Sequence, residues 1–119
     1  MKKILGLAAG LLLTAATHAQ SPVTFNDANG SYNKTTTQTF HFTVDAQHSE
    51  ADVTKAAEYY TSYFTVSYAA GAVTIQLVED TEMNRRIIQR FFVTLGVAEI
   101  TVNGTAIALE NFVDTYILP

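Results

Sequence analysis

The chain of 119 residues contains no cysteine. Without a thiol it cannot form disulfide bonds, use a thiolate nucleophile or hold a metal ion through cysteine ligands. Lipid attachment to a cysteine is excluded for the same reason. Small exported domains often depend on disulfide bonds for stability. We therefore expect this chain to depend on its hydrophobic core instead.

Positive charge is also scarce, with 7 lysine and arginine residues against 11 aspartate and glutamate residues and a formal net charge of −4. Two of the positive charges, Lys2 and Lys3, lie near the first residue, and their removal would leave −6. An acidic domain is repelled by the phosphate groups of nucleic acids and by anionic membranes. The charge therefore predicts that nucleic acid is not a partner.

Long hydrophobic runs are missing too, because the longest, at residues 4–16, is shorter than the ~20 residues that a membrane-spanning helix needs. This run follows Lys2 and Lys3 and precedes Thr-His-Ala at 17–19, a pattern of small residues around a cleavage point. The arrangement is typical of a secretory signal peptide. We predict a signal peptide at 1–19, export to the periplasm or the medium, and no membrane span after cleavage.

The remaining chain divides into two parts. Residues 20–37 are rich in Asn, Ser, Thr and Gly and are predicted to form a flexible leader. Residues 38–119 are predicted to form a single domain, whose apolar residues alternate with a period of two in some stretches and recur at helical spacing in others. These patterns predict strands at 39–45, 64–68, 73–77, 99–102 and 105–109, and helices at 49–63 and 81–95.

Two tight turns are expected between consecutive strands. Gly71 can adopt a positive φ between the second and third strands, and Asn103-Gly104 favours a type I′ hairpin between the last two. Ser49, with Asp52 three residues later, resembles a capping box at the start of the first helix. The apolar tail at 110–119 has no clear periodicity, so its form is left open.

The elements follow the order strand–helix–strand–strand–helix–strand, with an additional C-terminal strand. Amphipathic helices and one-sided strands favour an α+β two-layer sandwich, in which two helices cover one face of an antiparallel sheet. This is the ferredoxin-like, split βαβ arrangement.

From Thr39 to Leu109, the order and length of the elements resemble the small heavy-metal-associated domains of copper carriers and pumps. Gly96-Val97 is similar to the Gly-Val that precedes the last core strand in that family. In the family, a Cys-x-x-Cys metal clamp lies between the first strand and the first helix. The matching stretch here, VDAQHSEADV, has no cysteine. The resemblance therefore implies a fold and no functional residues.

The junction between the first strand and the first helix gathers polar side chains. Asp45, His48, Glu50 and Asp52, with His41 nearby on the strand, have oxygen and imidazole groups that can bind a divalent metal ion. The alternative is a solvated helix start, since carboxylates in the first turn complement the helix dipole. No second histidine stands at helical spacing from His48, which favours the capped helix. We therefore assign no metal and expect no cofactor.

Three arginines concentrate positive charge on the second predicted helix. Arg85, Arg86 and Arg90 could form a surface patch for an anion or an acidic partner, or could simply be the solvated face of the helix. Arg86 also stands four residues after Glu82, the spacing of a helical ion pair.

Two tyrosines of the first predicted helix form a second candidate surface. Tyr59 and Tyr63 stand four residues apart and could form a stacking platform, or could pack at the edge of the core.

No catalytic set accompanies these residues. The serines lack the pattern of a nucleophile elbow, and no glycine-rich loop suited to phosphate is present. We therefore expect a small exported non-enzymatic module that binds a ligand or a protein, including a second copy of itself. The alternatives are a periplasmic metal-handling domain that uses histidine and carboxylate ligands and, ranked last, a hydrolase.

Overall fold

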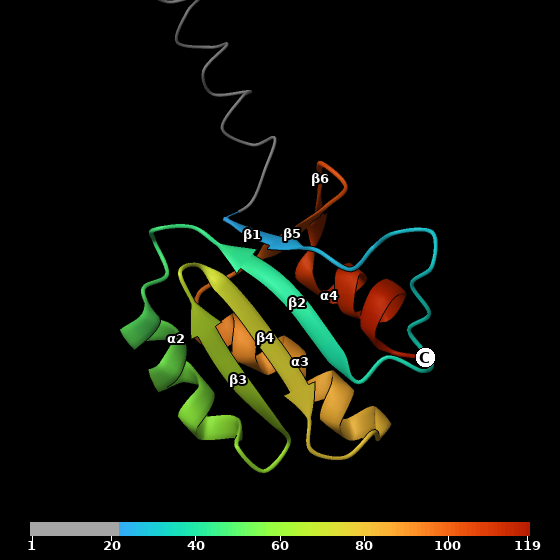
Figure 1. Cartoon of the computed structure of the whole chain (residues 1–119), viewed down its shortest axis with the longest axis horizontal. Helices are drawn as coiled ribbons and strands as arrows, with labels where there is room; N and C mark the ends of the chain where they lie inside the picture. Colours follow the sequence, from blue (N-terminus) through green and yellow to red (C-terminus); the bar gives the residue numbers. More distant parts are fainter. Residues whose placement is uncertain (1–21) are drawn as a thin grey trace, which may run out of the picture.

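The computed structural model describes residues 22–119, so the predicted signal peptide lies outside the described residues. Pairs of consecutive strands are followed by helical segments along the chain (Figure 1). In chain order the elements are β1 Val23–Phe25, β2 Thr39–Val44, α2 Glu50–Ala57, the 3₁₀ turn η1 Glu58–Tyr60, β3 Phe64–Ala69, β4 Ala72–Leu77, α3 Glu82–Thr94, β5 Glu99–Val102, β6 Thr105–Ala108, α4 Leu109–Phe112 and the π-helical turn η2 Val113–Ile117.

The six strands form one mixed sheet in the order β3-β4-β2-β1-β5-β6. Every neighbouring pair is antiparallel except β1 and β5, which are parallel. The predicted α+β class is confirmed. The prediction of an antiparallel sheet is wrong at the β1–β5 pair, because it did not include β1.

Strand β1 lies within the stretch that was predicted to be a flexible leader. It occupies a central position of the sheet, where Val23 pairs with Val44 and Phe25 pairs with Phe42. Both Val23 and Phe25 are buried. A strand of three residues has only one full period of alternation, and polar residues surround it on both sides. Periodicity therefore gave too weak a signal to place it.

The two predicted hairpin turns are confirmed. Ala70 and Gly71 have φ values of 50° and 89°, and Asn103 and Gly104 have φ values of 50° and 85°. Positive φ at both central residues is the property of a type I′ turn, whose twist matches that of the flanking strands. At Gly71 a β-carbon would also lie 3.1 Å from the Val44 carbonyl oxygen, so a side chain is doubly unfavourable there.

The two predicted helices form, but the first is shorter than expected. Ser49 caps α2 by accepting the Asp52 backbone N–H at 3.2 Å, and the helix ends at Ala57, before the η1 turn. In α3, Thr81 accepts the Asn84 backbone N–H at 3.0 Å. The tail whose form was left open becomes α4 and η2.

Aromatic side chains join the sheet to two helices. The Phe42 ring on β2 lies 4.9 Å from the Phe92 ring on α3, and the Phe25 ring on β1 lies 5.0 Å from the Phe112 ring on α4. These contacts place α3 and α4 against the side of the sheet that carries Phe25 and Phe42. Helix α2 packs beside β3 and buries Val53 (Figure 1).

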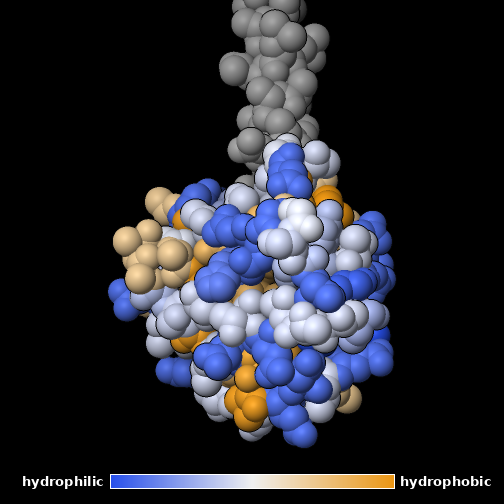
Figure 2. Space-filling view, turned by 45° about the vertical axis from the view of Figure 1, so that its right-hand side comes forward, coloured by the Kyte–Doolittle hydropathy of each residue, from blue (hydrophilic) through white to orange (hydrophobic). Residues whose placement is uncertain are grey.

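The opposite side of the sheet carries polar side chains. His41 and Thr43 on β2 and Gln76 on β4 are exposed. The space-filling view is mainly hydrophilic, with small, separate hydrophobic areas (Figure 2). Within residues 22–119, none of the helices has the length and apolar character needed to cross a membrane.

Candidate functional site

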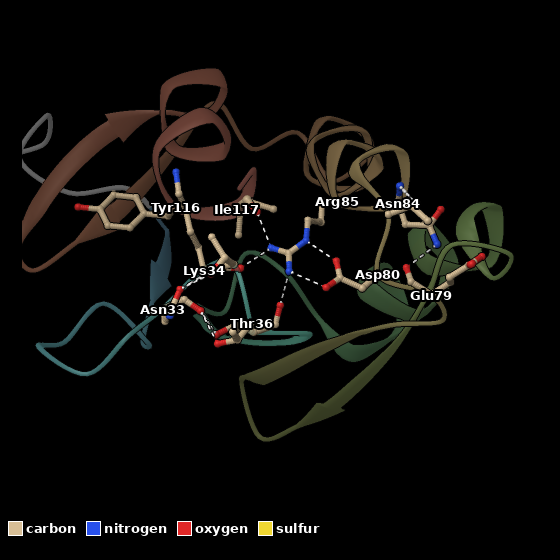
Figure 3. Close-up of polar contacts among 12 residues, drawn as sticks. Asn33, Lys34, Thr36, Glu79, Asp80, Asn84, Arg85, Tyr116 and Ile117 are labelled. Atoms are coloured by element: carbon tan, nitrogen blue, oxygen red, sulfur yellow. Dashed lines mark hydrogen bonds and ion pairs between the residues drawn. The ribbon is translucent and has the colours of Figure 1, made fainter.

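Arg85 does not lie on the surface, so its assignment to an exposed arginine patch is wrong. Its side chain is fully buried, and the guanidinium lies over the Phe40 ring, 5.7 Å from the ring centre. Buried arginine is costly unless every donor is paired. The surroundings of Arg85 meet that condition (Figure 3).

All five N–H donors of the Arg85 guanidinium have acceptors. Nε donates to Asp80 Oδ1 at 2.7 Å, and one terminal nitrogen donates to the backbone carbonyls of Lys34 and Ile117, both at 2.7 Å. The other terminal nitrogen donates to the Thr37 carbonyl at 2.6 Å and to Asp80 Oδ2 at 3.2 Å. No donor remains for a ligand, so the role of Arg85 is structural.

Arg85 also changes the pKa of Asp80, its ion-pair partner. The hydrogen bonds from Arg85 are the largest influence on Asp80 and lower the pKa of its carboxyl, although partial burial opposes them. Asp80 therefore stays ionised at pH values where an ordinary aspartate begins to take up a proton.

Three side chains hold three consecutive carbonyls near the last residues of the chain. Tyr32 donates its hydroxyl to the Tyr116 carbonyl, Lys34 Nζ donates to the Thr115 carbonyl at 2.9 Å, and Arg85 reaches Ile117. We call Tyr32, Lys34 and Arg85 the C-terminal clasp. It satisfies carbonyls that the end of a helix leaves without intrahelical partners.

The position of Tyr32 in the clasp changes the pKa of its hydroxyl. Burial is the main cause that raises the pKa of its hydroxyl, and the negative charge of Asp27 adds to the shift, while Arg85 opposes it. Tyr32 therefore remains a neutral donor. The clasp explains how the residues after β1 are tied down, and it offers no open position for a ligand.

His48 contrasts with this arrangement. Its side chain is only 8% exposed, and Nε2 is buried with no hydrogen-bond partner. In residues 22–119 it is the single buried side-chain nitrogen or oxygen in that condition. Leaving such a group unpaired costs about 1–3 kcal/mol.

His48 lines a surface pocket of about 620 Å³, which we call the His48 pocket. One wall is a stripe of α2 and η1, and the opposite wall is the end of α3 with the residues that follow it. The pocket is lined by Pro22, Gln47, His48, Asp52, Lys55, Ala56, Tyr59, Thr94, Leu95 and Gly96. Its volume falls within the range of about 300–1,000 Å³ that small-molecule sites occupy.

Two opposite charges face this pocket without forming a pair. Asp52 and Lys55 both line it. The only ion pairs among the described residues are those of His41, Arg85 and Arg86 with carboxylates elsewhere. Helix α2 brings Asp52 and Lys55 to one side, because they stand three residues apart. Tyr59 follows in η1 and lines the same pocket.

The candidate metal ligands are not brought together. His41 lies on the open side of the sheet, with Nδ1 3.0 Å from Asp27, whereas His48 lines its pocket. Asp45 accepts the Gln47 backbone N–H at 2.9 Å, and Glu50 is exposed in the first turn of α2. Over residues 22–119, no three histidine, cysteine or carboxylate side chains are grouped so that they could hold a metal ion.

The other residues predicted to bind a partner also lie in separate places. Arg86 pairs with Glu82 at 3.1 Å, as their spacing predicted. Arg86 and Arg90 line a second hollow of about 500 Å³ with Val93. Tyr63 lies after the η1 turn and packs in part against the core, so, contrary to the prediction, it does not share a helix with Tyr59.

Tyr59 lies within η1, next to Tyr60. Its ring is 66% exposed and lies 6.2 Å from the ring of Tyr60. The hydroxyl of Tyr60 is 2.6 Å from Thr94 Oγ1, which ties the η1 turn to the end of α3. This contact fixes the two walls of the His48 pocket relative to each other.

Sequence reasoning named His48 and Asp52 as candidate metal ligands beside the favoured interpretation of a capped helix start, and it assigned no metal. It missed Lys55 and Leu95, since neither stands in a recognisable motif. The helical spacing from Asp52 to Tyr59 was a signal that could have grouped the α2 residues. Comparison with known proteins finds no match to a family model, to a curated protein or to a solved structure.

Proposed function

We propose that this protein is a small exported binding module without catalytic activity, and that its ligand occupies the His48 pocket. One observation carries the proposal: His48 lines that pocket, and its Nε2 is buried without a hydrogen-bond partner. Buried polar groups in native proteins are nearly always hydrogen-bonded, so an exception needs a specific cause. A ligand that supplies the missing partner is such a cause.

The contrast within the molecule supports the proposal. Folding satisfies all five donors of Arg85 with precise placement of three distant carbonyls. A chain able to do this could also have paired His48 or replaced it with an apolar residue. Retaining an unpaired imidazole beside an open pocket favours a role in binding.

The absence of catalytic activity is part of the proposal. The hydroxyl beside His48 in the sequence, Ser49 Oγ, accepts the Asp52 backbone N–H and caps α2. A nucleophile needs a general base within hydrogen-bonding distance, and His48 Nε2 has no such hydroxyl as a partner. Binding without bond cleavage fits these groups better than hydrolysis.

We also propose that the fold is a ferredoxin-like arrangement with one strand inserted and with α2 and α3 on one face. Strand β4 separates β2 from β3, the two strands that α2 connects. A parallel pair divided by an antiparallel strand is the feature of a split βαβ unit. Strand β1 would then be the insertion, because it separates β2 from β5.

The binding proposal can be tested by nuclear magnetic resonance on the exported chain labelled with ¹⁵N at histidine. The chain would be titrated with a panel of free amino acids, glucose, citrate and inorganic phosphate. We expect at least one compound to shift the His48 ring signals and to leave those of His41 unchanged. His41 is the matched control, because it is half exposed and already contacts Asp27. A panel that leaves His48 unmoved would contradict the proposal.

A further inference from the structure

The two charges of the His48 pocket restrict what the pocket can bind. Neither Asp52 nor Lys55 forms an ion pair within the described residues. Lys55 attracts an anion that Asp52 repels, and Asp52 attracts a cation that Lys55 repels. A ligand that carries one charge of each sign interacts favourably with both.

The spacing of these charges suits a small ligand. Residues three apart on a helix have β-carbons about 5–6 Å apart, so their side chains can reach one compact molecule. In a free α-amino acid, the ammonium and the carboxylate are attached to the same carbon atom. One such molecule can therefore place its carboxylate near Lys55 and its ammonium near Asp52.

The rest of the pocket lining is suited to an apolar side chain. Pro22, Ala56 and Leu95 contribute apolar surface, and the exposed ring of Tyr59 stands at the edge. Aromatic and aliphatic groups pack well against such a ring. His48 lines the same pocket, and a ligand can pair with its Nε2 once the ring turns toward the ligand, because that nitrogen is closed to solvent in this structure.

From this combination we infer that the His48 pocket binds a free α-amino acid with an apolar side chain. The inference rests on the proposed function and adds the class of ligand to it. Asp52 and Lys55 select the two charges, the apolar lining selects the side chain, and His48 contributes one further polar contact.

The test compares four probes by isothermal titration calorimetry on the exported chain. L-Phenylalanine carries both charges, N-acetyl-L-phenylalanine lacks the ammonium, L-phenylalaninamide lacks the carboxylate, and glucose carries no charge. We expect L-phenylalanine to bind, and each singly charged analogue to bind about tenfold more weakly, because each loses one hydrogen bond to a charged group. Glucose should not bind.

Two variants locate the selection. Asp52→Asn should weaken L-phenylalanine about tenfold and leave the affinity for N-acetyl-L-phenylalanine unchanged or improved, since the repulsion of the anion is removed. Glu58→Gln is the matched control, because Glu58 stands on η1 but does not line the His48 pocket. It should leave all affinities unchanged. Circular dichroism of each variant verifies that α2 remains folded.

The outcomes separate the ligand class from the site. Equal binding of L-phenylalanine and either singly charged analogue overturns the inferred class. Binding of glucose or phosphate at His48, without binding of any amino acid, also overturns the class and leaves the proposed site standing. If no probe shifts the His48 signals, both the class and the site are wrong.

Discussion

Arg85 and His48 are both buried polar side chains, and the protein treats them in opposite ways. Arg85 gives each of its donors an acceptor, drawn from segments up to 51 residues away in the chain. His48 leaves Nε2 without any. The first residue lies in a closed interior, and the second lines an open pocket. Complete pairing indicates a structural role, whereas a missing partner on a residue that lines a pocket supports the proposed ligand site.

We expect the largest change in stability from replacing Arg85, the side chain whose donors are all paired. Arg85→Ala removes the donor of three backbone carbonyls and leaves Asp80 without its counter-charge. We expect a loss of about 3–5 kcal/mol in the free energy of unfolding, measured by urea denaturation. Arg90→Ala on the same helix is the control and should change it by less than about 0.5 kcal/mol. Similar losses in both variants would contradict the structural role of Arg85.

Protonation of Asp80, the ion-pair partner of Arg85, should lower the stability by a smaller amount. The pKa of Asp80 is lowered in the folded protein, chiefly by the hydrogen bonds from Arg85. Its stabilising contribution is therefore present above the ordinary aspartate pKa of about 3.9 and is lost as the pH falls through that value towards the lower folded pKa. Unfolding measured between pH 6 and pH 2 should show this loss. Asp80→Asn should remove that part of the acid dependence, and an unchanged profile in the variant would speak against it.

Replacing His48, whose Nε2 has no partner, should not lower the stability and could raise it. His48→Phe keeps a ring in place and removes the unsatisfied nitrogen, so we expect stability to be unchanged or to rise by up to about 1–3 kcal/mol. The same variant should lose ligand binding at the pocket. Thermal unfolding and titration of one preparation measure both quantities. A large loss of stability would indicate that His48 serves the fold rather than a ligand.

The smallest expected effect sharpens the contrast within the clasp. Tyr32→Phe removes the hydroxyl that the Tyr116 carbonyl accepts and should cost about 1 kcal/mol in the free energy of unfolding. Ligand affinity at the His48 pocket should not change, because Tyr32 does not line it. Urea denaturation and titration test the two halves of this prediction. A change in affinity without a change in stability would reverse the roles that we assign.

The sequence was most informative where structure depends on near neighbours in the chain. The cap at Ser49 and the turn at Asn103-Gly104 involve residues at most four positions apart, and both formed as expected. Strand β1 was missed because its stability comes from partners elsewhere in the sheet. Local patterns cannot report such pairing.

The candidate site shows the same limit of local sequence patterns. His48 was noticed because it stands at a helix start with carboxylates around it, but its burial could not be read from that spacing. The burial of Arg85 was also hidden, since its neighbours Arg86 and Arg90 suggest an exposed helix face. Its acceptors at Lys34, Thr37 and Ile117 lie 51, 48 and 32 residues away. Side-chain periodicity cannot anticipate contacts over that range.

The clasp also has a consequence for biosynthesis. Arg85 leaves the ribosome 32 residues before Ile117, the last of its acceptors to be made. Until that acceptor has been added, the guanidinium lacks a complete set of partners and its burial is unfavourable. A chain that lacks Ile117 therefore leaves Arg85 without a complete set of acceptors, and we expect its packing to be less stable.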